Sequence, residues 1–284
     1  MEIRIGSHPS NLSLFILRYR GVLESAATEQ KWTLTWTDYT QGARSGEWLA
    51  RNELDVVGTG STPPISAQAG GLDVAYLASS PSRDASCALL THQNRDLSRL
   101  KGARLSAMIG SFTDHFLARL LQKKQLRRSD VELVDIQGEA ALNALLSGEI
   151  DGWLAIDPWL THARKHEGIK TSVSVGDEIT NRSLFWTRSD WPARYPQAAA
   201  WIVEQLRLND NWIASNIESA AQLLTQHLNS AITAEEWQRT LRARPWGITP
   251  ADESLIAEQQ QQADDLFAVG FIPAAVNVSH RRTA

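Results

Sequence analysis

The sequence has almost no cysteine, no long hydrophobic run and no excess of positive charge. Its single cysteine, Cys87, excludes an internal disulfide and any cysteine-based metal site. No run approaches the ~20 apolar residues of a transmembrane helix. The net charge is −4 and the basic residues are scattered, which argues against nucleic acid or an anionic membrane as the main partner. What remains is a globular chain of 284 residues, long enough for two ordinary domains.

Known catalytic and cofactor signatures are also missing. The sequence contains no nucleophile elbow, P-loop, dinucleotide fingerprint or HExxH motif. His8 and His115 lack neighbours at metal-ligand spacing, so no metal site is expected. Asp114 beside His115 is a poor acid–base pair, because adjacent helical residues diverge by about 100°. These gaps lower the expectation of an enzyme without excluding one.

Short strand patterns alternate with helical ones over the first two thirds of the chain. This alternation predicts an α/β fold with mostly parallel sheets flanked by helices. After Pro192 the pattern becomes helical almost to the end. Strands are expected at 3–6, 32–37, 54–59, 74–78, 87–91, 104–107, 131–135, 152–156, 171–175 and 184–188.

An internal echo bears on the number of lobes. Both copies read as a turn, a helix and a strand, which predicts two lobes built on related α/β units. The residues Gln41, Gly42, Leu49, Glu53, Leu54 and Asp55 recur at a constant offset as Gln137, Gly138, Leu145, Glu149, Ile150 and Asp151.

The segment GTGSTPPISAQAGG at 58–71 joins a strand to a helix and has the composition of an oxyanion site. Thr62 is expected to cap the helix, and Pro63 suits the first helical position. The turn before it would aim free N–H groups and hydroxyls at one spot beside the positive end of the helix.

Four loops of this kind follow strands, at the edge where open α/β sheets bind ligands. They are, in chain order, residues 7–11, 59–64, 110–115 and 157–159. Their hydroxyls and amides suit a permanently ionised anion such as a sulfonate, although each hydroxyl alone could simply cap a helix. The histidines are either structural or charge-assisted donors. The tryptophans, one of them on the strand at 184–188, belong either to the core or to a pocket wall. The candidate ligand-binding residues are His8, Ser10, Asn11, Gly60, Ser61, Thr62, Ser111, Phe112, Thr113, His115, Asp157, Trp159 and Trp186.

Five segments in order carry a resemblance to one family. They are the segment 58–71, IGSFTDHFLARLLQKKQL at 109–126, GEIDGWLAIDPWL at 148–160, NRSLFWTRSDW at 181–191 and ITPADESLIAEQQQQADDLFAVGFIP at 248–273. Together they resemble the extracytoplasmic solute-binding proteins of ABC importers for aliphatic sulfonates, within the wider nitrate, sulfonate and taurine group. The resemblance implies a two-lobed periplasmic binding protein fold with its ligand cleft between the lobes. Lobe 1 would comprise residues 1–85 and 186–284, with the helical C-terminal part packed on it, and lobe 2 residues 86–185.

The resemblance also implies a function without catalysis or cofactor. Such a protein captures an organic anion, closes around it and docks on the membrane permease, typically as a monomer. It implies a periplasmic or extracytoplasmic location, whereas the strand-like start at Met1, without a signal peptide, is also compatible with a cytoplasmic protein. Ligand contacts carry over to Ser61, Thr62, Ser111, Thr113 and the segment 157–159. The segment 8–10 and bulky Phe112 depart from the family pattern and indicate an unusual or narrower pocket.

Alternatives remain open at this point. The protein could bind taurine, nitrate or a pyrimidine vitamin precursor instead. It could also be a cytoplasmic enzyme on the same bilobal fold, with His8, His115 or Asp157 as the catalytic group. A third alternative, the effector-sensing domain of a regulator, is disfavoured because no DNA-binding segment is present.

Overall fold

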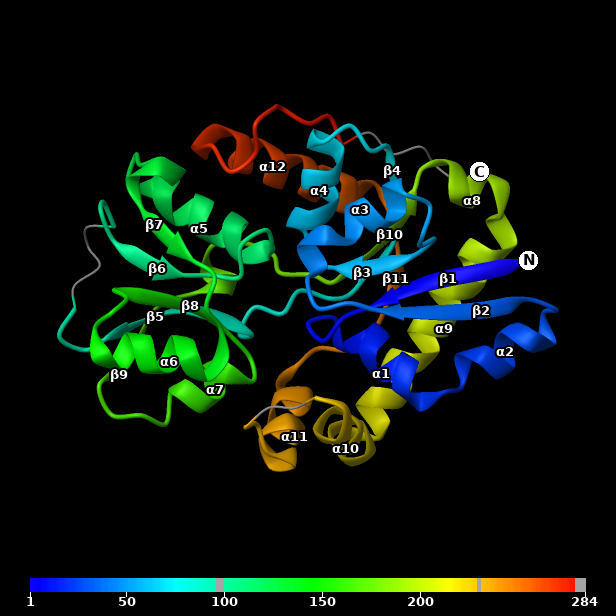
Figure 1. Cartoon of the computed structure of the whole chain (residues 1–284), viewed down its shortest axis with the longest axis horizontal. Coiled ribbons are helices and arrows are strands. Elements are labelled where there is room, and N and C mark those ends of the chain that lie inside the picture. Colours follow the sequence, from blue (N-terminus) through cyan, green and yellow to red (C-terminus); the bar gives the residue numbers. More distant parts are fainter. Residues whose placement is uncertain (96–99, 229–230, 279–284) are drawn as a thin grey trace.

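The described residues form three sheets at the centres of two lobes, two sheets in lobe 1 and one in lobe 2, and the lobes lie side by side in Figure 1. The computed structural model describes residues 1–95, 100–228 and 231–278. Every strand expected from the sequence is present, because each apolar run is bounded by turn residues. Lobe 1 contains β1 (Glu2–Ser7), β2 (Thr33–Asp38), β3 (Val57–Thr59), β4 (Val74–Ser79), β10 (Leu184–Arg188) and the unpredicted β11 (Thr249–Pro250); lobe 2 contains β5 (Cys87–His92), β6 (Arg104–Ser106), β7 (Glu132–Val134), β8 (Gly152–Ile156) and β9 (Ile169–Ser174).

Both lobes have mixed sheets. Lobe 2 has the strand order β7-β6-β8-β5-β9, and lobe 1 pairs β11-β4-β10-β3 and β1-β2, joined by a parallel bridge between Ile5 and Val56. The two-lobed α/β fold is confirmed, but the expectation of mostly parallel sheets is wrong. β10 pairs antiparallel with β3 and β4, and β5 with β8 and β9. These two strands enter their sheets from the other lobe and therefore run against their neighbours.

Helices cover the sheets of both lobes (Figure 1). Their ends follow local signals, such as Asn11 before α1 and the left-handed Gly148 after α6. With lobe 1 lie α1 (Leu12–Arg20), α2 (Leu23–Glu29), α3 (Ser45–Ala50), α4 (Thr62–Ala69), α8 (Asp190–Arg194), α9 (Pro196–Ser215), α10 (Ile217–His227) and α11 (Ala234–Ala243); with lobe 2 lie α5 (Phe112–Lys123), α6 (Gly138–Ser147) and α7 (Trp159–Ala163).

The last helix, α12 (Glu253–Val269), lies across both lobes rather than on lobe 1 alone, which corrects the sequence prediction. It packs against α4 of lobe 1 and α5 of lobe 2. Leu266 is fully buried in an apolar core that continues from Val57 of lobe 1 to Leu89 of lobe 2. On its polar side, Asp265 accepts hydrogen bonds from Arg119 and Gln122 of α5.

Two hinge segments, residues 80–86 and 175–183, run between the lobes. They are bonded to each other: Ser80 N donates to Ser183 O at 2.9 Å, and Arg83 N donates to Asn181 O at 2.9 Å. The lobe boundaries predicted at 85/86 and 185/186 stay a prediction, and the second one falls inside β10.

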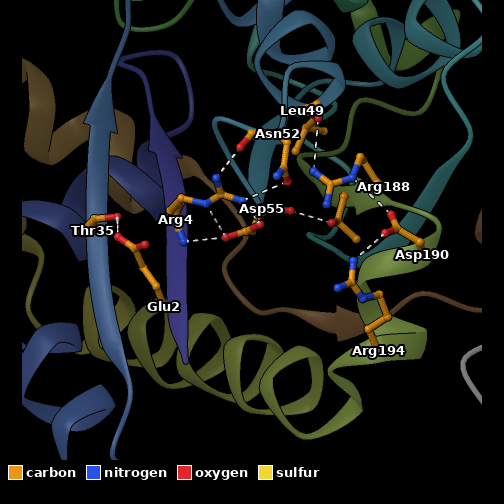
Figure 2. A network of polar contacts seen from close by, with 10 residues as sticks. Glu2, Arg4, Thr35, Leu49, Asn52, Asp55, Arg188, Asp190 and Arg194 are labelled. Atoms are coloured by element: carbon orange, nitrogen blue, oxygen red, sulfur yellow. Dashed lines mark hydrogen bonds and ion pairs between the residues drawn. The ribbon is translucent and has the colours of Figure 1, made fainter.

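The sequence echo corresponds to a repeated local structure. In lobe 1, Asp55 N donates to Arg4 O at 2.8 Å, and Asp55 Oδ2 accepts from Arg4 N at 2.9 Å (Figure 2). In lobe 2, Asp151 N donates to Arg104 O at 2.8 Å, and Asp151 Oδ2 accepts from Arg104 N at 2.8 Å. Each aspartate thus fixes the start of one strand to its neighbour in the same way, as expected for two related α/β units.

Candidate ligand-binding cleft

A cleft of about 1380 Å³ lies between the lobes. All four predicted loops reach it, together with the hinge segment 80–86 and the residues around the end of α11. Of the candidate residues, His8, Ser10, Gly60, Ser111, Phe112, Asp157 and Trp159 line it, whereas Asn11, Ser61, Thr62, Thr113, His115 and Trp186 do not.

The start of α4 presents backbone rather than hydroxyls to the cleft. Ser61, not Thr62, is the N-cap residue, so the helix begins one residue earlier than predicted. Both side chains are buried, at 0% and 2% exposed, and neither hydroxyl has a hydrogen-bond partner within the described residues. Gly60 lines the cleft beside them. Ligand contact by these two hydroxyls stays a prediction.

The start of α5 uses its hydroxyls for capping. Ser111 Oγ accepts from Thr113 N at 3.2 Å, and Thr113 Oγ1 donates to Met108 O at 3.0 Å. Phe112 then fills the gap between the two helix starts: a Cβ on Gly60 would lie 3.3 Å from Phe112 Cβ and Cδ1. The two lobes therefore touch at this point. The unusual or narrower pocket expected from the bulky Phe112 stays a prediction.

The first loop supplies a neutral histidine. His8 Nε2 donates to Gly58 O at 2.7 Å, and burial lowers the pKa of His8 to about 4. The ring is uncharged at neutral pH, which favours a structural role for His8 over that of a charge-assisted hydrogen-bond donor. Asn11 Oδ1 accepts from Leu14 N at 3.1 Å and so caps α1, whereas exposed Ser10 lies across the cleft from Met108.

Two candidates lie in the packed interior. His115 Nε2 contacts Asp265 Oδ2 of α12 at 3.0 Å. Trp186 is fully buried, and its Nε1 donates to Thr59 Oγ1 at 2.9 Å. Since neither lines the cleft, Trp186 belongs to the core rather than to a pocket wall.

The fourth loop forms one wall of the cleft. Asp157 Oδ1 accepts from Thr161 N at 3.0 Å and from Thr161 Oγ1 at 2.7 Å, and burial raises the pKa of Asp157. Trp159 lies half-buried against Gly138, where an added Cβ would meet the indole at 3.2 Å. Asp157 thus holds the start of α7, and Trp159 offers an apolar surface to a ligand.

The sequence reasoning missed two arginines that line the cleft. Arg83, 7% exposed, donates through Nε and Nη2 to Asn181, and Arg244 Nη2 donates to Ser183 Oγ at 3.3 Å. Neither forms an ion pair with any residue that the structure describes. Only the folding of the chain brings them together, since they are far apart in sequence and belong to no motif.

Both guanidinium groups carry charge in a poorly solvated place. Burial, followed by the charge of Arg244, holds the pKa of Arg83 well below its ordinary value. Burial lowers the pKa of Arg244 to about 10 against the opposing charge of Asp210. Arginine stays protonated at neutral pH, so the cleft contains the buried charge of Arg83 and the half-buried charge of Arg244, neither with a direct carboxylate partner. Such an arrangement is suited to an anion.

A polar contact joins the two lobes between α11 and the region of α7. Glu236 of α11 contacts His162 Nδ1 at 2.9 Å and Lys165 Nζ at 2.5 Å. Burial raises the pKa of Glu236, but hydrogen bonds from Lys165, Thr233 and His162 outweigh it and lower that pKa to about 2. This contact, called the α7–α11 contact below, exists only while the lobes are together.

No group of three or more His, Cys, Asp or Glu side chains within the described ranges could hold a metal ion. In the same part of the chain, no helix has the length and apolar character needed to cross a bilayer.

Two α/β lobes, joined by two hinge segments and separated by a ligand-sized cleft, define the periplasmic binding protein class of fold. Residues 32–228 match the NMT1-like family, and the chain belongs to this family. It is 24% identical to the "Putative aliphatic sulfonates-binding protein" of Escherichia coli (strain K12), over 98% of this chain and 88% of that protein.

Solved structures show the same fold. The alkanesulfonate-binding protein SsuA from Xanthomonas axonopodis pv. citri, bound to MOPS, superimposes with a TM-score of 0.83 at 24% identity, covering 98% of this chain and 96% of that one. The periplasmic aliphatic sulphonate binding protein SsuA from Escherichia coli gives a TM-score of 0.84 at 22% identity, covering 100% and 94%.

Proposed function

We propose that this chain is the solute-binding component of an ABC importer and captures a sulfonate-type organic anion in the interlobe cleft. The observation that carries the proposal is a pair of arginines, buried Arg83 and half-buried Arg244, which line the cleft without an ion-pair partner in the described part of the chain. A poorly solvated charge without an ion-pair partner is costly, and an anionic ligand supplies such a partner. Relatives named for sulfonate binding support the same conclusion.

A sulfonate fits the chemistry of the cleft better than a small inorganic ion does. A sulfonate keeps its charge at any physiological pH and needs donors but no proton transfer. The volume of about 1380 Å³ leaves room for an organic tail, and Trp159 and Phe112 offer it apolar surface. Nitrate would leave most of this space unfilled.

The candidate catalytic groups are all engaged in local structure. His8 bonds to Gly58 O, His115 to Asp265, and Asp157 to Thr161. This supports binding rather than catalysis. The proposed protein works outside the cytoplasm as a monomer, and its closed form, held by the α7–α11 contact, docks on the membrane permease.

A thermal-shift screen tests the proposed function directly. The panel contains ethanesulfonate, taurine, benzenesulfonate and MOPS, with nitrate and sulfate for comparison. At least one sulfonate is expected to raise the melting temperature, because a ligand selective for the folded state stabilises it. Arg83→Gln and Arg244→Gln should each weaken calorimetric affinity for that sulfonate about tenfold or more, since bonds to charged groups contribute ~1.5–3 kcal/mol.

Arg242→Gln is the matched control, because Arg242 is exposed on the last turn of α11 and does not line the cleft. Its affinity should equal that of the wild type. The proposal is overturned if no sulfonate shifts the melting temperature, or if both arginine variants bind as tightly as the control.

A further inference from the structure

The second half of α11 and the residue after it present hydrogen-bond donors to the cleft that have no acceptor. Trp237 and Thr240 lie three residues apart on α11 and so share a helix face, and Arg244 follows at the C-cap, directly after the last helical residue. All three line the cleft. Trp237 Nε1, Thr240 Oγ1 and Arg244 Nε are buried without a hydrogen-bond partner among residues 1–95, 100–228 and 231–278. Buried donors are nearly always paired, so three unpaired ones lining the same part of the cleft indicate an absent acceptor.

The same place carries the positive charge of the cleft. Arg83 approaches from the hinge segment 80–86, and Arg244 bonds to Ser183 of the other hinge segment. Burial lowers the pKa of both arginines, and the charge of Arg244 lowers that of Arg83 further. Asp210 is near enough to raise both pKa values, but by less. Asp210 Oδ2 accepts from Gly247 N at 3.2 Å rather than from a guanidinium. These three groups alone sum to +1, which a monoanion neutralises. The carboxyl groups of Asp84, Asp135, Glu139 and Asp157 also line the cleft and disfavour a second negative charge on the ligand.

The alternative place for an anion, between the starts of α4 and α5, is already filled. Phe112 packs directly on Gly60, within 3.3 Å of where a Cβ would lie. Ser111 and Thr113 use their hydroxyls in capping bonds. Ser61 and Thr62 also have unpaired buried hydroxyls, but unlike Trp237, Thr240 and Arg244 these two residues do not line the cleft. An anionic head placed there would have to displace an aromatic ring that is only 7% exposed.

We infer that the ligand is a monoanionic oxyanion whose head is bound at the hinge end of the cleft by Arg83, Arg244, Thr240 and Trp237. The inference rests on the proposed function and specifies its ligand: a sulfonate or a sulfate monoester rather than a dianion. The oxygens of the head accept hydrogen bonds from the indole N–H of Trp237, the hydroxyl of Thr240 and the guanidinium N–H groups of the two arginines. Its tail then extends along the cleft toward Trp159.

Calorimetry on the full chain, with the panel sulfonate that stabilises the wild type most, tests the position of the head. Thr240→Val keeps the shape of the side chain and removes the hydroxyl; Trp237→Phe removes the indole N–H. Each is expected to weaken binding about tenfold, while the double variant S61A/T62A stays within about twofold of the wild type. Thr225→Val, an exposed threonine on α10, is the matched control and should not change affinity.

The charge of the head is tested with two ligands that share a tail, propyl sulfate and propyl phosphate, at pH 8. The monoanionic sulfate should bind at least tenfold more tightly than the dianionic phosphate. Asp210→Asn keeps an acceptor for Gly247 N and raises the net charge by one. It should therefore reduce the ratio of the affinity for propyl sulfate to the affinity for propyl phosphate.

The outcomes separate the inference from the proposed function. A wild type that binds none of these anions overturns both. A wild type that binds a sulfonate, but is weakened by S61A/T62A and not by Thr240→Val or Trp237→Phe, overturns the inference alone. Equal affinity for propyl sulfate and propyl phosphate contradicts the monoanion assignment.

Discussion

At the residue scale, the proposed function depends on charged groups inside the cleft, and these residues were the hardest to predict. The hydroxyls of Ser111 and Thr113 look like ligand contacts in the sequence, but a cap and an anion site use the same residue types. Arg83 gives no sequence signal at all, because a surface arginine and a buried one read alike. Burial and the lack of a carboxylate are properties of the fold.

Asp114 is a second buried charge, and its removal should stabilise the protein. Its Oδ2 accepts from Gly110 N at 2.8 Å, and burial raises its pKa from 3.8 to about 7. Between these pH values the folded chain holds a proton that the unfolded chain has lost, so stability falls as pH rises through this window. The penalty is complete above pH 7.

Asp114→Asn keeps the acceptor for Gly110 N and removes the charge. At pH 8 it should raise the free energy of unfolding by about 1–3 kcal/mol, the order of an unpaired buried charge. Near pH 4 the variant and the wild type should be equally stable in denaturant titrations. A constant difference at all pH values would show that the charge is not responsible.

At the element scale, strands were predicted well and their directions were not. Each apolar run between turn residues became a strand, and Gly152–Ile156 and Leu184–Arg188 match to the residue. β11, Thr249–Pro250, was missed because two residues show no periodicity. Strand direction depends on where the chain crosses between lobes, and the position of α12 depends on packing against α4 and α5. The local sequence pattern determines neither the strand direction nor the position of α12.

The first turn of α11 combines helix capping with the α7–α11 contact. Glu236 Oε2 accepts from Thr233 N at 2.9 Å, while Oε1 contacts Lys165. Glu236→Gln should lower the free energy of unfolding at pH 7 by about 1–2 kcal/mol, from a weakened cap and a lost pair with the half-exposed Lys165.

The pH dependence identifies the charge. The pKa of Glu236 falls from 4.5 to about 2 on folding, so its contribution is complete above pH 4.5 and disappears as pH falls toward 2. The stability difference between Glu236→Gln and the wild type should shrink over this range in denaturant titrations. Glu235→Gln, at an exposed neighbouring position, should show no such change. A pH-independent difference would assign the effect to the cap alone.

At the scale of the whole molecule, the resemblance of five ordered segments was enough to predict two lobes and a cleft between them. The recurrence of Asp55 as Asp151 predicted two related α/β units independently of the family resemblance. In the structure both aspartates make the same hydrogen bonds to the backbone of a neighbouring strand. The residues that meet in the cleft depend on how closely the lobes approach each other. That distance depends on contacts such as Phe112 on Gly60, which no local pattern reports.

The hinge segments are packed without room for a methyl group. A Cβ on Gly176 would lie 2.4 Å from Asp84 Cβ and 2.9 Å from its backbone. Gly176→Ala should therefore push the segments apart and lower the free energy of unfolding by about 1–3 kcal/mol. Gly70→Ala, whose Cβ would meet only atoms at 3.4 Å or beyond, is the control and should be nearly neutral. Thermal unfolding that shows equal stability for both variants would contradict this account of the hinge.

The position of α12 determines how the molecule can open. Because α12 is packed on both α4 and α5, the two lobes cannot separate on that side without breaking a shared apolar core. We therefore expect opening to be a rotation with its axis near α12 and with the greatest separation on the opposite side, between α7 and α11 (Figure 1). Spin labels on α7 and α11 should report two distances without ligand, one for the open and one for the closed form, and only the shorter distance with ligand. A pair of labels on α5 and α12 should report the same single distance with and without ligand.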